Sequence, residues 1–304
     1  MDLVSLKDWS TADILTTVDT GIALKQDPSR YAKALEGRTL GLLFQKTSTR
    51  TRCAGEIGIF QLGGQAVYLD WSVTNFSLAD LGDEIRVLSS YVDFILARLL
   101  KHEDVVISAA ASSVPLMNGC CNRYHPLQAL TDLQSIKERM GRLEGVKLVF
   151  VGPYNNVCNS LVAAALKVGM EVKVVAPEID EKTIDRSLLE ALEAAGGGLS
   201  EDLRGTLEAG DVVYTDTWID MEYFLDPAFA AERERRVQKF VPYQLNAELL
   251  AGLDIQIMHC LPAHRGYEID GALLDDPRSI MFDQAENRLH SQKAVLLKLA
   301  GRLD

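Results

Sequence analysis

The sequence predicts an α/β protein with two domains, each a parallel sheet flanked by helices, and with the active site in the cleft between the domains. Short apolar runs recur along the chain, separated by helical or loop-like spacers, which is the pattern of buried parallel strands. The length of 304 residues suits two domains of ordinary size. Apolar residues make up 47% of the chain, so each domain can bury a core.

Eight apolar runs are the predicted strands. In chain order they are Leu40–Phe44, Ala66–Leu69, Val92–Leu96, Val114–Met117, Val146–Val151, Val172–Ala176, Val212–Tyr214 and Ile255–Met258. A polar helical stretch, Thr131–Leu143, lies between the fourth and fifth runs, where it can bridge the two domains.

Three later segments complete the predicted outline. The glycine-rich stretch 194–198 should end a helix and turn the chain. The charged run Ala231–Arg236 is typical of a solvated helix face. Gln284–Leu303 places apolar residues near one face of a helix, so this segment should pack on the core.

Composition and charge exclude several functions. The net charge of −12 argues against nucleic acid as a partner. No apolar run is long enough to span a membrane and the start of the chain lacks a signal pattern, so we expect a cytoplasmic protein with no membrane partner. The five cysteines are scattered and form no CxxC pair, so we expect neither a disulfide framework nor a metal site.

The segment Ser48–Arg52, with the sequence STRTR, is the first candidate for ligand binding. It follows a predicted strand and precedes a plausible helix, so its amides and hydroxyls should lie at a helix N-terminus, where anions bind. Residues two apart point to different sides of a helix, so we assign Arg50 as the ligand and Arg52 as structural. An N-cap followed by exposed arginines is the alternative, and this segment alone does not decide between them.

A second candidate lies at the start of a predicted helix. His125 and Gln128 are three residues apart and share one face of a helix that Pro126 should begin, so both can contact a carbonyl or amide group. Ordinary helix capping is the alternative. Arg98 follows a predicted strand, on the side where ligands bind in open α/β sheets, although a surface arginine is the commoner case.

Polar residues also follow the later strands. His259 and Cys260 close the last predicted strand, again at its carboxyl end. Asp216 and Asn156 follow two others. Cys260 can instead be a small buried residue, and both Asp216 and Asn156 can serve ordinary turns.

Four segments together resemble the aspartate and ornithine carbamoyltransferase family, most closely its ornithine branch. They are FQKTSTRTR (44–52), HPLQALTDL (125–133), HCLPAHRG (259–266) and FDQAENRLHSQKAVL (282–296), in the family's order and spacing. The resemblance implies a carbamoyl phosphate-binding domain at 1–134, completed by a C-terminal helix at 285–304, and an amino acid-binding domain at 135–284. No cofactor and no metal ion are expected.

The resemblance also implies roles for single residues. Those that would hold carbamoyl phosphate are Ser48, Thr49, Arg50, Thr51, Arg98, His125, Gln128, Cys260, Leu261 and Arg288. Those that would bind the amino acid are Asn156, Asp216, Asp220 and Met221. The predicted catalytic residues are Cys260, Arg98, His125 and Asp216, with Asp216 and Cys260 flanking the amine. The expected reaction is the carbamoylation of ornithine to citrulline by direct attack, without a covalent enzyme intermediate.

The chain departs from the ornithine branch in the segment after Trp218. Asp220 replaces a serine, Glu222 replaces a glycine, and the segment through Phe240 is several residues longer. Two added carboxylates would favour a longer or more cationic amine, so lysine, a polyamine and an N-acylated ornithine remain alternatives to ornithine. Pro153 also stands where an aspartate is common.

The family implies a homotrimer, or a multiple of trimers, in which a loop of the neighbouring subunit completes each site. That loop often carries a glutamine, and here it has the sequence WSVTNFS (71–77). Thr74 falls near the glutamine position. Trp71 is the other candidate, because related enzymes that act on N-acylated ornithines use a tryptophan there, and packing within the loop is its alternative role.

Two other classes of function fit the sequence less well. A nucleotide-dependent oxidoreductase would need GxGxxG after the fifth strand, and the chain has Gly152-Pro-Tyr-Asn-Asn-Val instead. A non-catalytic sensor of phosphate compounds would not need an amine site, but Asn156, Asp216, Met221 and Cys260 are all present.

Overall fold

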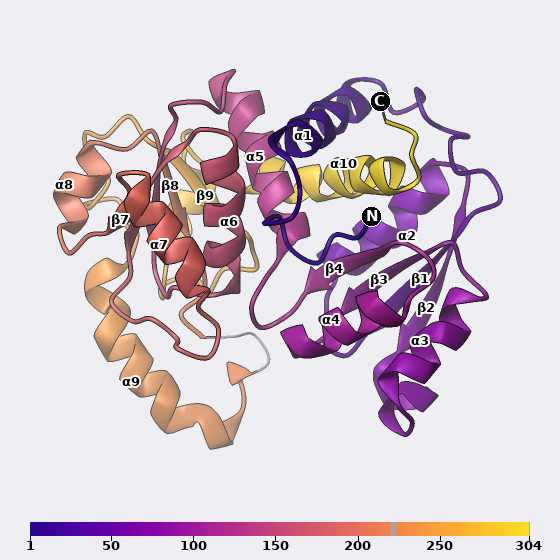
Figure 1. Ribbon diagram of the computed structural model, residues 1–304. Coiled ribbons are helices and arrows are strands. Elements are labelled where there is room, and N and C mark those ends of the chain that lie inside the picture. The colour runs from indigo at the N-terminus through magenta and orange to yellow at the C-terminus, as the bar shows by residue number, and fades with distance from the viewer. Residues whose placement is uncertain (220–222, 304) are drawn as a thin grey trace. The chain divides into compact units, whose positions relative to one another are not determined.

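The computed structural model describes residues 1–219 and 223–303. The chain divides into two compact units (Figure 1). Unit 1 consists of Met1–Gln134 and Glu286–Asp304, and unit 2 of Ser135–Ala285. The divisions fall inside two helices, α5 (Pro126–Met140) and α10 (Met281–Leu299).

Unit 1 contains a parallel sheet with the strand order β2-β1-β3-β4. Its strands are β1 (Thr39–Phe44), β2 (Gln65–Asp70), β3 (Phe94–Arg98) and β4 (Leu116–Cys120). Its helices, besides α5 and α10, are α1 (Thr11–Gln26), α2 (Arg50–Gln61), α3 (Leu81–Ser89) and α4 (His102–Ala111). Helices α3 and α4 lie on one face of the sheet, and α2 and α10 on the other (Figure 1). Both faces are covered, which is why β1 after Thr39 and β3 before Arg98 consist of buried residues without polar side chains.

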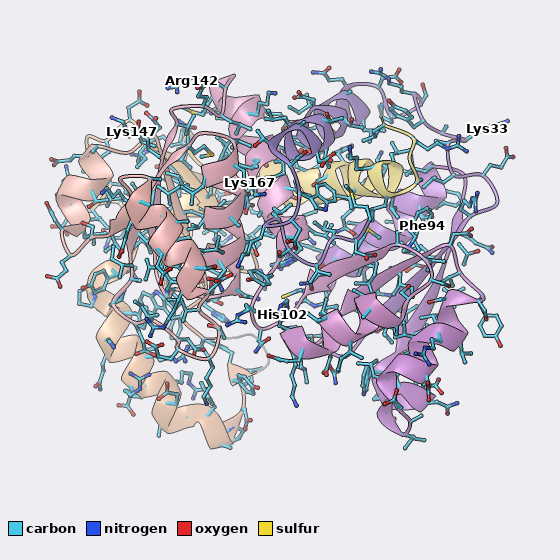
Figure 2. The ribbon with its side chains drawn as sticks, viewed as in Figure 1. Lys33, Phe94, His102, Arg142, Lys147 and Lys167 are labelled. Carbon is cyan, nitrogen blue, oxygen red and sulfur yellow. The ribbon has the colours of Figure 1, made fainter. Side chains whose placement is uncertain are left out.

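Unit 2 contains a second parallel sheet, with the order β7-β6-β5-β8-β9. Its strands are β5 (Lys147–Val151), β6 (Glu171–Val175), β7 (Gly198–Leu199), β8 (Val212–Thr215) and β9 (Gln256–His259). Its helices are α6 (Asn156–Lys167), α7 (Arg186–Ala194), α8 (Leu203–Glu208) and α9 (Ala230–Phe240). In Figure 2, Phe94 marks β3 of unit 1 and Lys147 marks the start of β5.

The predicted fold class is confirmed, with local corrections. All eight predicted strands are present, but β3 begins two residues late, directly after Asp93, whose carboxylate accepts from the Thr39 amide. Strand β7 was missed, since two residues carry no periodicity. The helix predicted at Thr131–Leu143 begins earlier, at Pro126, and ends at Met140, before Gly141 with its φ of 74°.

Two further findings concern membrane-spanning helices and the state of the cysteines. Within the described ranges, no helix is long and apolar enough to cross a membrane. All five cysteines are free thiols, and of these Cys53 is exposed.

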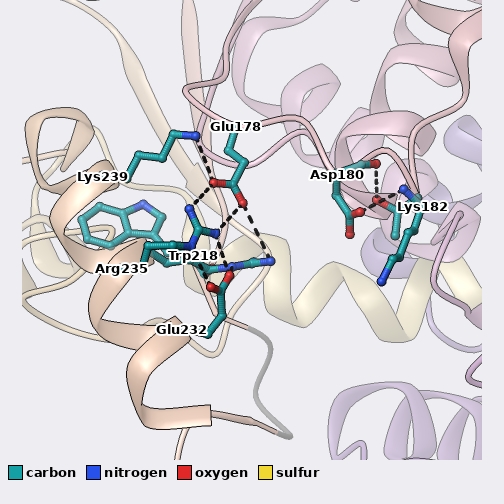
Figure 3. A network of polar contacts seen from close by, with 9 residues as sticks. Glu178, Asp180, Lys182, Trp218, Glu232, Arg235 and Lys239 are labelled. Carbon is teal, nitrogen blue, oxygen red and sulfur yellow. Dashed lines mark hydrogen bonds and ion pairs between the residues drawn. The ribbon is translucent and has the colours of Figure 1, made fainter.

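The charged face of helix α9 is largely exposed, as predicted, and it also forms a network of ion pairs. Arg235 donates to both oxygens of Glu178, at 2.8 and 3.0 Å, and Lys239 Nζ lies 3.0 Å from Glu178 Oε2 (Figure 3). Arg236 donates to Glu232 Oε1 at 2.9 Å and to the carbonyl oxygen of Trp218 at 3.1 Å. Because Glu178 follows β6, the network ties α9 to the carboxyl edge of the sheet in unit 2.

Replacing Glu178 by glutamine should lower the stability of unit 2 by about 1 kcal/mol, the upper range for partly exposed ion pairs. Hydrogen bonds from Arg235, followed by Lys239, lower the pKa of Glu178 from 4.5 to about 2. A lowered carboxylate pKa stabilises the fold above pH 4.5, and this contribution is lost as the pH falls from 4.5 towards 2. Urea unfolding of wild type and variant, in low salt and in about 1 M salt, measures the difference, which salt should reduce.

Glu181→Gln is the matched control for this prediction. Glu181 forms one exposed ion pair, with Arg186, and its loss should change the unfolding free energy much less. Equal effects of the two substitutions, or an effect of Glu178→Gln that salt leaves unchanged, would contradict the assignment.

Candidate active site

The polar residues of unit 1 gather at the carboxyl edge of its sheet. The STRTR segment follows β1, Arg98 is the last residue of β3, and Cys120 is the last residue of β4. Cys120 has a φ of 155°, a strained backbone for a residue other than glycine. Since parallel strands end at the same edge, these segments are brought together by the topology.

Arg288 joins three segments of unit 1 that are far apart in the sequence. Its Nη2 donates to Thr51 Oγ1 at 3.0 Å, and its Nη1 donates to Gln128 Oε1 at 2.6 Å and lies 3.5 Å from His125 Nε2. Gln128 Nε2 in turn donates to Asp132 Oδ1 at 2.7 Å. All five side chains are buried, with Arg288 only 2% exposed. We call Thr51, His125, Gln128, Asp132 and Arg288 the Arg288 cluster.

The electrostatics of the Arg288 cluster favour an anion. Burial, followed by the positive charges of Arg50 and Arg98, lowers the pKa of Arg288 from 12.5 to about 10. Burial, followed by the charge of Arg288, holds the pKa of His125 well below 6.5, so His125 is neutral at physiological pH. A dianionic phosphate would relieve the repulsion among these cations.

The remaining residues of the predicted phosphate segment lie at the start of α2. Thr49 is its N-cap and Arg50 its first residue, so the segment lies at a helix N-terminus, as the sequence predicted. Ser48 Oγ accepts from the Thr51 amide at 3.2 Å. Arg52 lies over the ring of Tyr68, 3.7 Å from its centroid, which agrees with a structural role.

Arg98 lies close to this segment. Its Nε donates to the carbonyl oxygen of Thr47 at 3.2 Å, and its Nη1 lies 3.5 Å from the carbonyl oxygen of Gly119. The side chain therefore connects the loop after β1 with the end of β4, and its charge acts on both His125 and Arg288.

Asp216 is the centre of the polar residues of unit 2. Its Oδ1 accepts from the Thr217 amide at 2.8 Å and from the thiol of Cys260 at 2.9 Å. Its Oδ2 accepts from Asn155 Nδ2 at 2.7 Å. Asn155 is also the N-cap of α6, so the carboxylate is positioned by a helix start and by the segment after β9. Cys260 and Leu261, which the sequence assigned to carbamoyl phosphate, belong to this unit.

Buried polar residues hold the segment after β9 in place. His259 Nδ1 accepts from the Leu261 amide at 2.7 Å, while His259 Nε2 lies 3.1 Å from Glu268 Oε1. Leu261 has a φ of 54°, a conformation that few residues other than glycine adopt. Among the described residues, one ligand atom from each of Asp216, His259 and Cys260 lies within 4.8 Å of the others, but both ring nitrogens of His259 are engaged by Leu261 and Glu268, so this grouping is better explained as a hydrogen-bonded scaffold than as a metal site.

The rest of the predicted amine site is only partly described. Asn156 is the first residue of α6, beside the Asn155 cap. Asp220, Met221 and Glu222 lie outside the described residues. Just beyond them, the ring of Phe224 stacks on His264, with centroids 3.7 Å apart.

The two loop candidates make contacts within their own segment. The rings of Trp71 and Phe76 lie 5.6 Å apart, and Thr74 Oγ1 donates to the carbonyl oxygen of Asp70 at 3.0 Å. These contacts agree with loop packing for Trp71 and leave its role towards a neighbouring subunit a prediction.

Sequence reasoning missed Asp132, Asn155 and Glu268. Asp132 lies one helical turn after Gln128, and Asn155 directly precedes a helix, where asparagine is a common cap. Both signals were available in the sequence. The contact between Glu268 and His259 had no such signal, because it depends on how the segment after β9 folds back.

Comparisons with known proteins agree with the fold and assign a domain family to each part of the chain. Residues 1–138 match the family described as "Aspartate/ornithine carbamoyltransferase, carbamoyl-P binding domain", and residues 144–299 match "Aspartate/ornithine carbamoyltransferase, Asp/Orn binding domain". The chain belongs to the aspartate/ornithine carbamoyltransferase family.

The relatives are named for one branch of the family. The chain is 42% identical to the ornithine carbamoyltransferase of Thermococcus kodakarensis, across 99% of this chain and 96% of that protein. It is 45% identical to that of Methanobrevibacter smithii, across 87% and 88%. The solved ornithine carbamoyltransferase of Pyrococcus furiosus is 40% identical, with a TM-score of 0.90 over 100% of this chain and 98% of that one.

Proposed function

We propose that this protein transfers the carbamoyl group of carbamoyl phosphate to L-ornithine, giving L-citrulline and phosphate. The observation that carries the proposal is the Arg288 cluster, which gathers three motif segments around a buried cation. Relatives named ornithine carbamoyltransferase cover nearly the whole chain, and one of them, from Pyrococcus furiosus, is named as anabolic. We therefore propose arginine biosynthesis as the metabolic role.

Each unit has a proposed substrate. Residues 1–134 with 285–304 bind carbamoyl phosphate, because they carry the Arg288 cluster and the STRTR segment. Residues 135–284 bind the amino acid, because they carry Asp216 and Cys260, a carboxylate and a thiol suited to an amine. Asn156, Asp220 and Met221 are the proposed further contacts of the amino acid.

The phosphate and the carbamoyl oxygen are bound by different donors. Arg50 and Arg288 bind phosphate oxygens, together with the hydroxyls and amides of Ser48 and Thr49 at the start of α2. Thr51, Arg98 and His125 donate to the carbamoyl oxygen, on which negative charge develops. Because His125 is neutral, it stabilises this charge by hydrogen bonding rather than by transferring a proton.

The chemical step needs no covalent enzyme intermediate. The neutral amine nitrogen attacks the carbamoyl carbon, the bond from that carbon to the phosphate oxygen breaks, and the departing phosphate takes the proton that nitrogen loses. Since an amine with a pKa of about 10 is mostly protonated at neutral pH, the site must favour its neutral form. Asp216 and Cys260 orient the nitrogen.

The acceptor amine is tested with a panel of ornithine, lysine, putrescine and N-acetylornithine, each with carbamoyl phosphate. We expect ornithine to give the highest kcat/KM, measured both as phosphate release and as formation of the ureido product. Asp220 and Glu222 supply the reason to include the other amines. Carbamoylation of another amine, with none of ornithine, would overturn the choice of acceptor but keep the class of reaction.

We also propose a homotrimer in the cytoplasm. Unit 1 exposes large apolar side chains on α2, on the edge strand β2 and in the loop after it; they include Phe60 (73% exposed), Val73 (81%) and Leu78 (84%). A patch of this kind suits a subunit interface, with Trp71 or Thr74 reaching the neighbouring site. Sedimentation equilibrium measures the oligomeric state.

The proposed location in the cytoplasm is supported by the cysteines. All five are free thiols, which suits a reducing compartment.

A further inference from the structure

Gln128 lies between a buried anion and a buried cation. Its Nε2 donates to Asp132 Oδ1 at 2.7 Å, and Arg288 Nη1 donates to its Oε1 at 2.6 Å. Gln128 is 3% exposed, Asp132 0% and Arg288 2%. Asp132 and Gln128 are one turn apart on α5, so their relative position is set by the helix.

These partners allow the Gln128 amide one orientation. A carboxylate can only accept hydrogen bonds, and a guanidinium can only donate them. Rotating the amide by half a turn would place its NH2 group against Arg288 and its oxygen against Asp132, two repulsive contacts in a buried site. The amide oxygen is therefore fixed on the side of Arg288 and Thr51.

The fixed oxygen, Gln128 Oε1, is a hydrogen-bond acceptor in a site whose other side chains are mainly donors. Arg50, Arg98 and Arg288 carry donors only, and the Thr51 hydroxyl, which accepts from Arg288, keeps its own proton to donate. A carbamoyl group needs donors for its oxygen and an acceptor for its NH2 group. Arg288 uses one of the two lone pairs of Gln128 Oε1, so the second can accept from that NH2 group.

We propose that Asp132 is a positioning residue that fixes Gln128 with its oxygen towards the carbamoyl NH2 group, and that it thereby selects carbamoyl phosphate over acyl phosphates with a methyl group in that place. The inference rests on the proposed binding of carbamoyl phosphate to the Arg288 cluster. A buried acceptor left without its donor costs binding free energy, so an analogue without the NH2 group binds less well.

The test compares two stable probes that differ in this group. Phosphonoacetamide carries the NH2 group, and acetonylphosphonate carries a methyl group instead. Binding of each is measured by calorimetry to the full-length protein, without amine. Wild type should prefer phosphonoacetamide, and Asp132→Ala should reduce that preference by about 10-fold while acetonylphosphonate affinity changes by less than about 3-fold.

Asp132→Asn is the matched conservative variant. Its amide oxygen can still accept from Gln128 Nε2, so we expect its preference to stay within about 3-fold of wild type. Should Asp132→Ala fail to fold, Asp132→Ser takes its place, since its shorter hydroxyl cannot reach Gln128. Equal weakening of both probes, or an unchanged preference, would overturn the proposal, because a merely structural residue would act on both probes alike.

A double substitution tests the route through Gln128. In a Gln128→Leu background the preference is already lost, and adding Asp132→Ala should not lower it further. A further loss would mean that Asp132 acts by another route, and the positioning role would be wrong. If wild type bound neither probe, the carbamoyl phosphate site itself would fail. The amine panel measures turnover of carbamoyl phosphate itself, so it distinguishes a failure of the proposed function from a failure of the role given to Asp132.

Discussion

Arg288→Gln is expected to lower kcat/KM for carbamoyl phosphate by at least about 10³-fold. The guanidinium lies 3.0 Å from Thr51 Oγ1 and 2.6 Å from Gln128 Oε1, so it both supplies charge and orders two proposed ligands. Glutamine keeps a polar side chain but loses the charge and the paired donors. Steady-state kinetics with carbamoyl phosphate varied at saturating amine measure the loss.

The same substitution should leave stability unchanged or raise it in the absence of ligand. Arg288 is buried beside the charges of Arg50 and Arg98, which together with burial lower its pKa to about 10. Removing one of three mutually repelling cations relieves this cost. Thermal melting should therefore give an equal or higher Tm for the variant, while added phosphate should raise the Tm of wild type only.

Arg52→Gln is the matched control for Arg288→Gln. Arg52 is an arginine of the STRTR segment, but it lies over Tyr68 and within 3.6 Å of the Glu56 carboxylate. Its loss should change kcat/KM by less than about 3-fold, as for a surface residue. If Arg52→Gln matched the loss of Arg288→Gln, or if Arg288→Gln bound carbamoyl phosphate as wild type does, the assigned roles would be wrong.

Asp216→Asn is expected to reduce kcat by about 10² to 10³-fold while leaving the KM for carbamoyl phosphate within about 3-fold. The carboxylate accepts from Thr217, Cys260 and Asn155, so its position is fixed before the amine arrives. Asparagine has one acceptor oxygen and no charge, so it must lose one of these contacts and its attraction for the amine. Rates with carbamoyl phosphate and amine varied separately distinguish the two substrates.

Cys260→Ser is the comparison for Asp216→Asn. Serine keeps a donor towards Asp216 Oδ1, so we expect a smaller loss, of about 10-fold or less, seen in the use of the amine. Mass spectrometry after incubation with carbamoyl phosphate should find no adduct on Cys260. A carbamoylated cysteine that turns over on adding amine would overturn direct attack.

The sequence predicted the sheets well because most of their strands contain a short apolar run that is buried between helices. It also predicted which strand ends carry polar residues, since parallel topology places those ends at one edge. It could not predict contacts such as that of Arg288 with Thr51, which lie 237 residues apart. Such contacts depend on how helices pack, and neither periodicity nor a local motif encodes that packing.

Partners of the predicted residues were harder to predict than the residues themselves. Asn155 was passed over for Asn156, although Asn155 both caps α6 and holds Asp216. The charged run in α9 is exposed as expected, but its ion pair with Glu178 was not predicted, because Glu178 lies 57 residues from Arg235 and no pattern links the two. Such pairs become visible only when two segments are brought side by side.

Unit 1 consists of two separate segments of the chain, and this affects the order in which the two units can fold during synthesis. Residues 135–285 form a continuous stretch and can fold as soon as they emerge, whereas unit 1 needs Glu286–Asp304, which are synthesised after all of unit 2. Loop closure over such a long separation is slow, so the Arg288 cluster forms after the rest of the chain. A growing chain that has reached only unit 2 would therefore lack Arg288, and the anion site would be completed only after unit 2 has emerged.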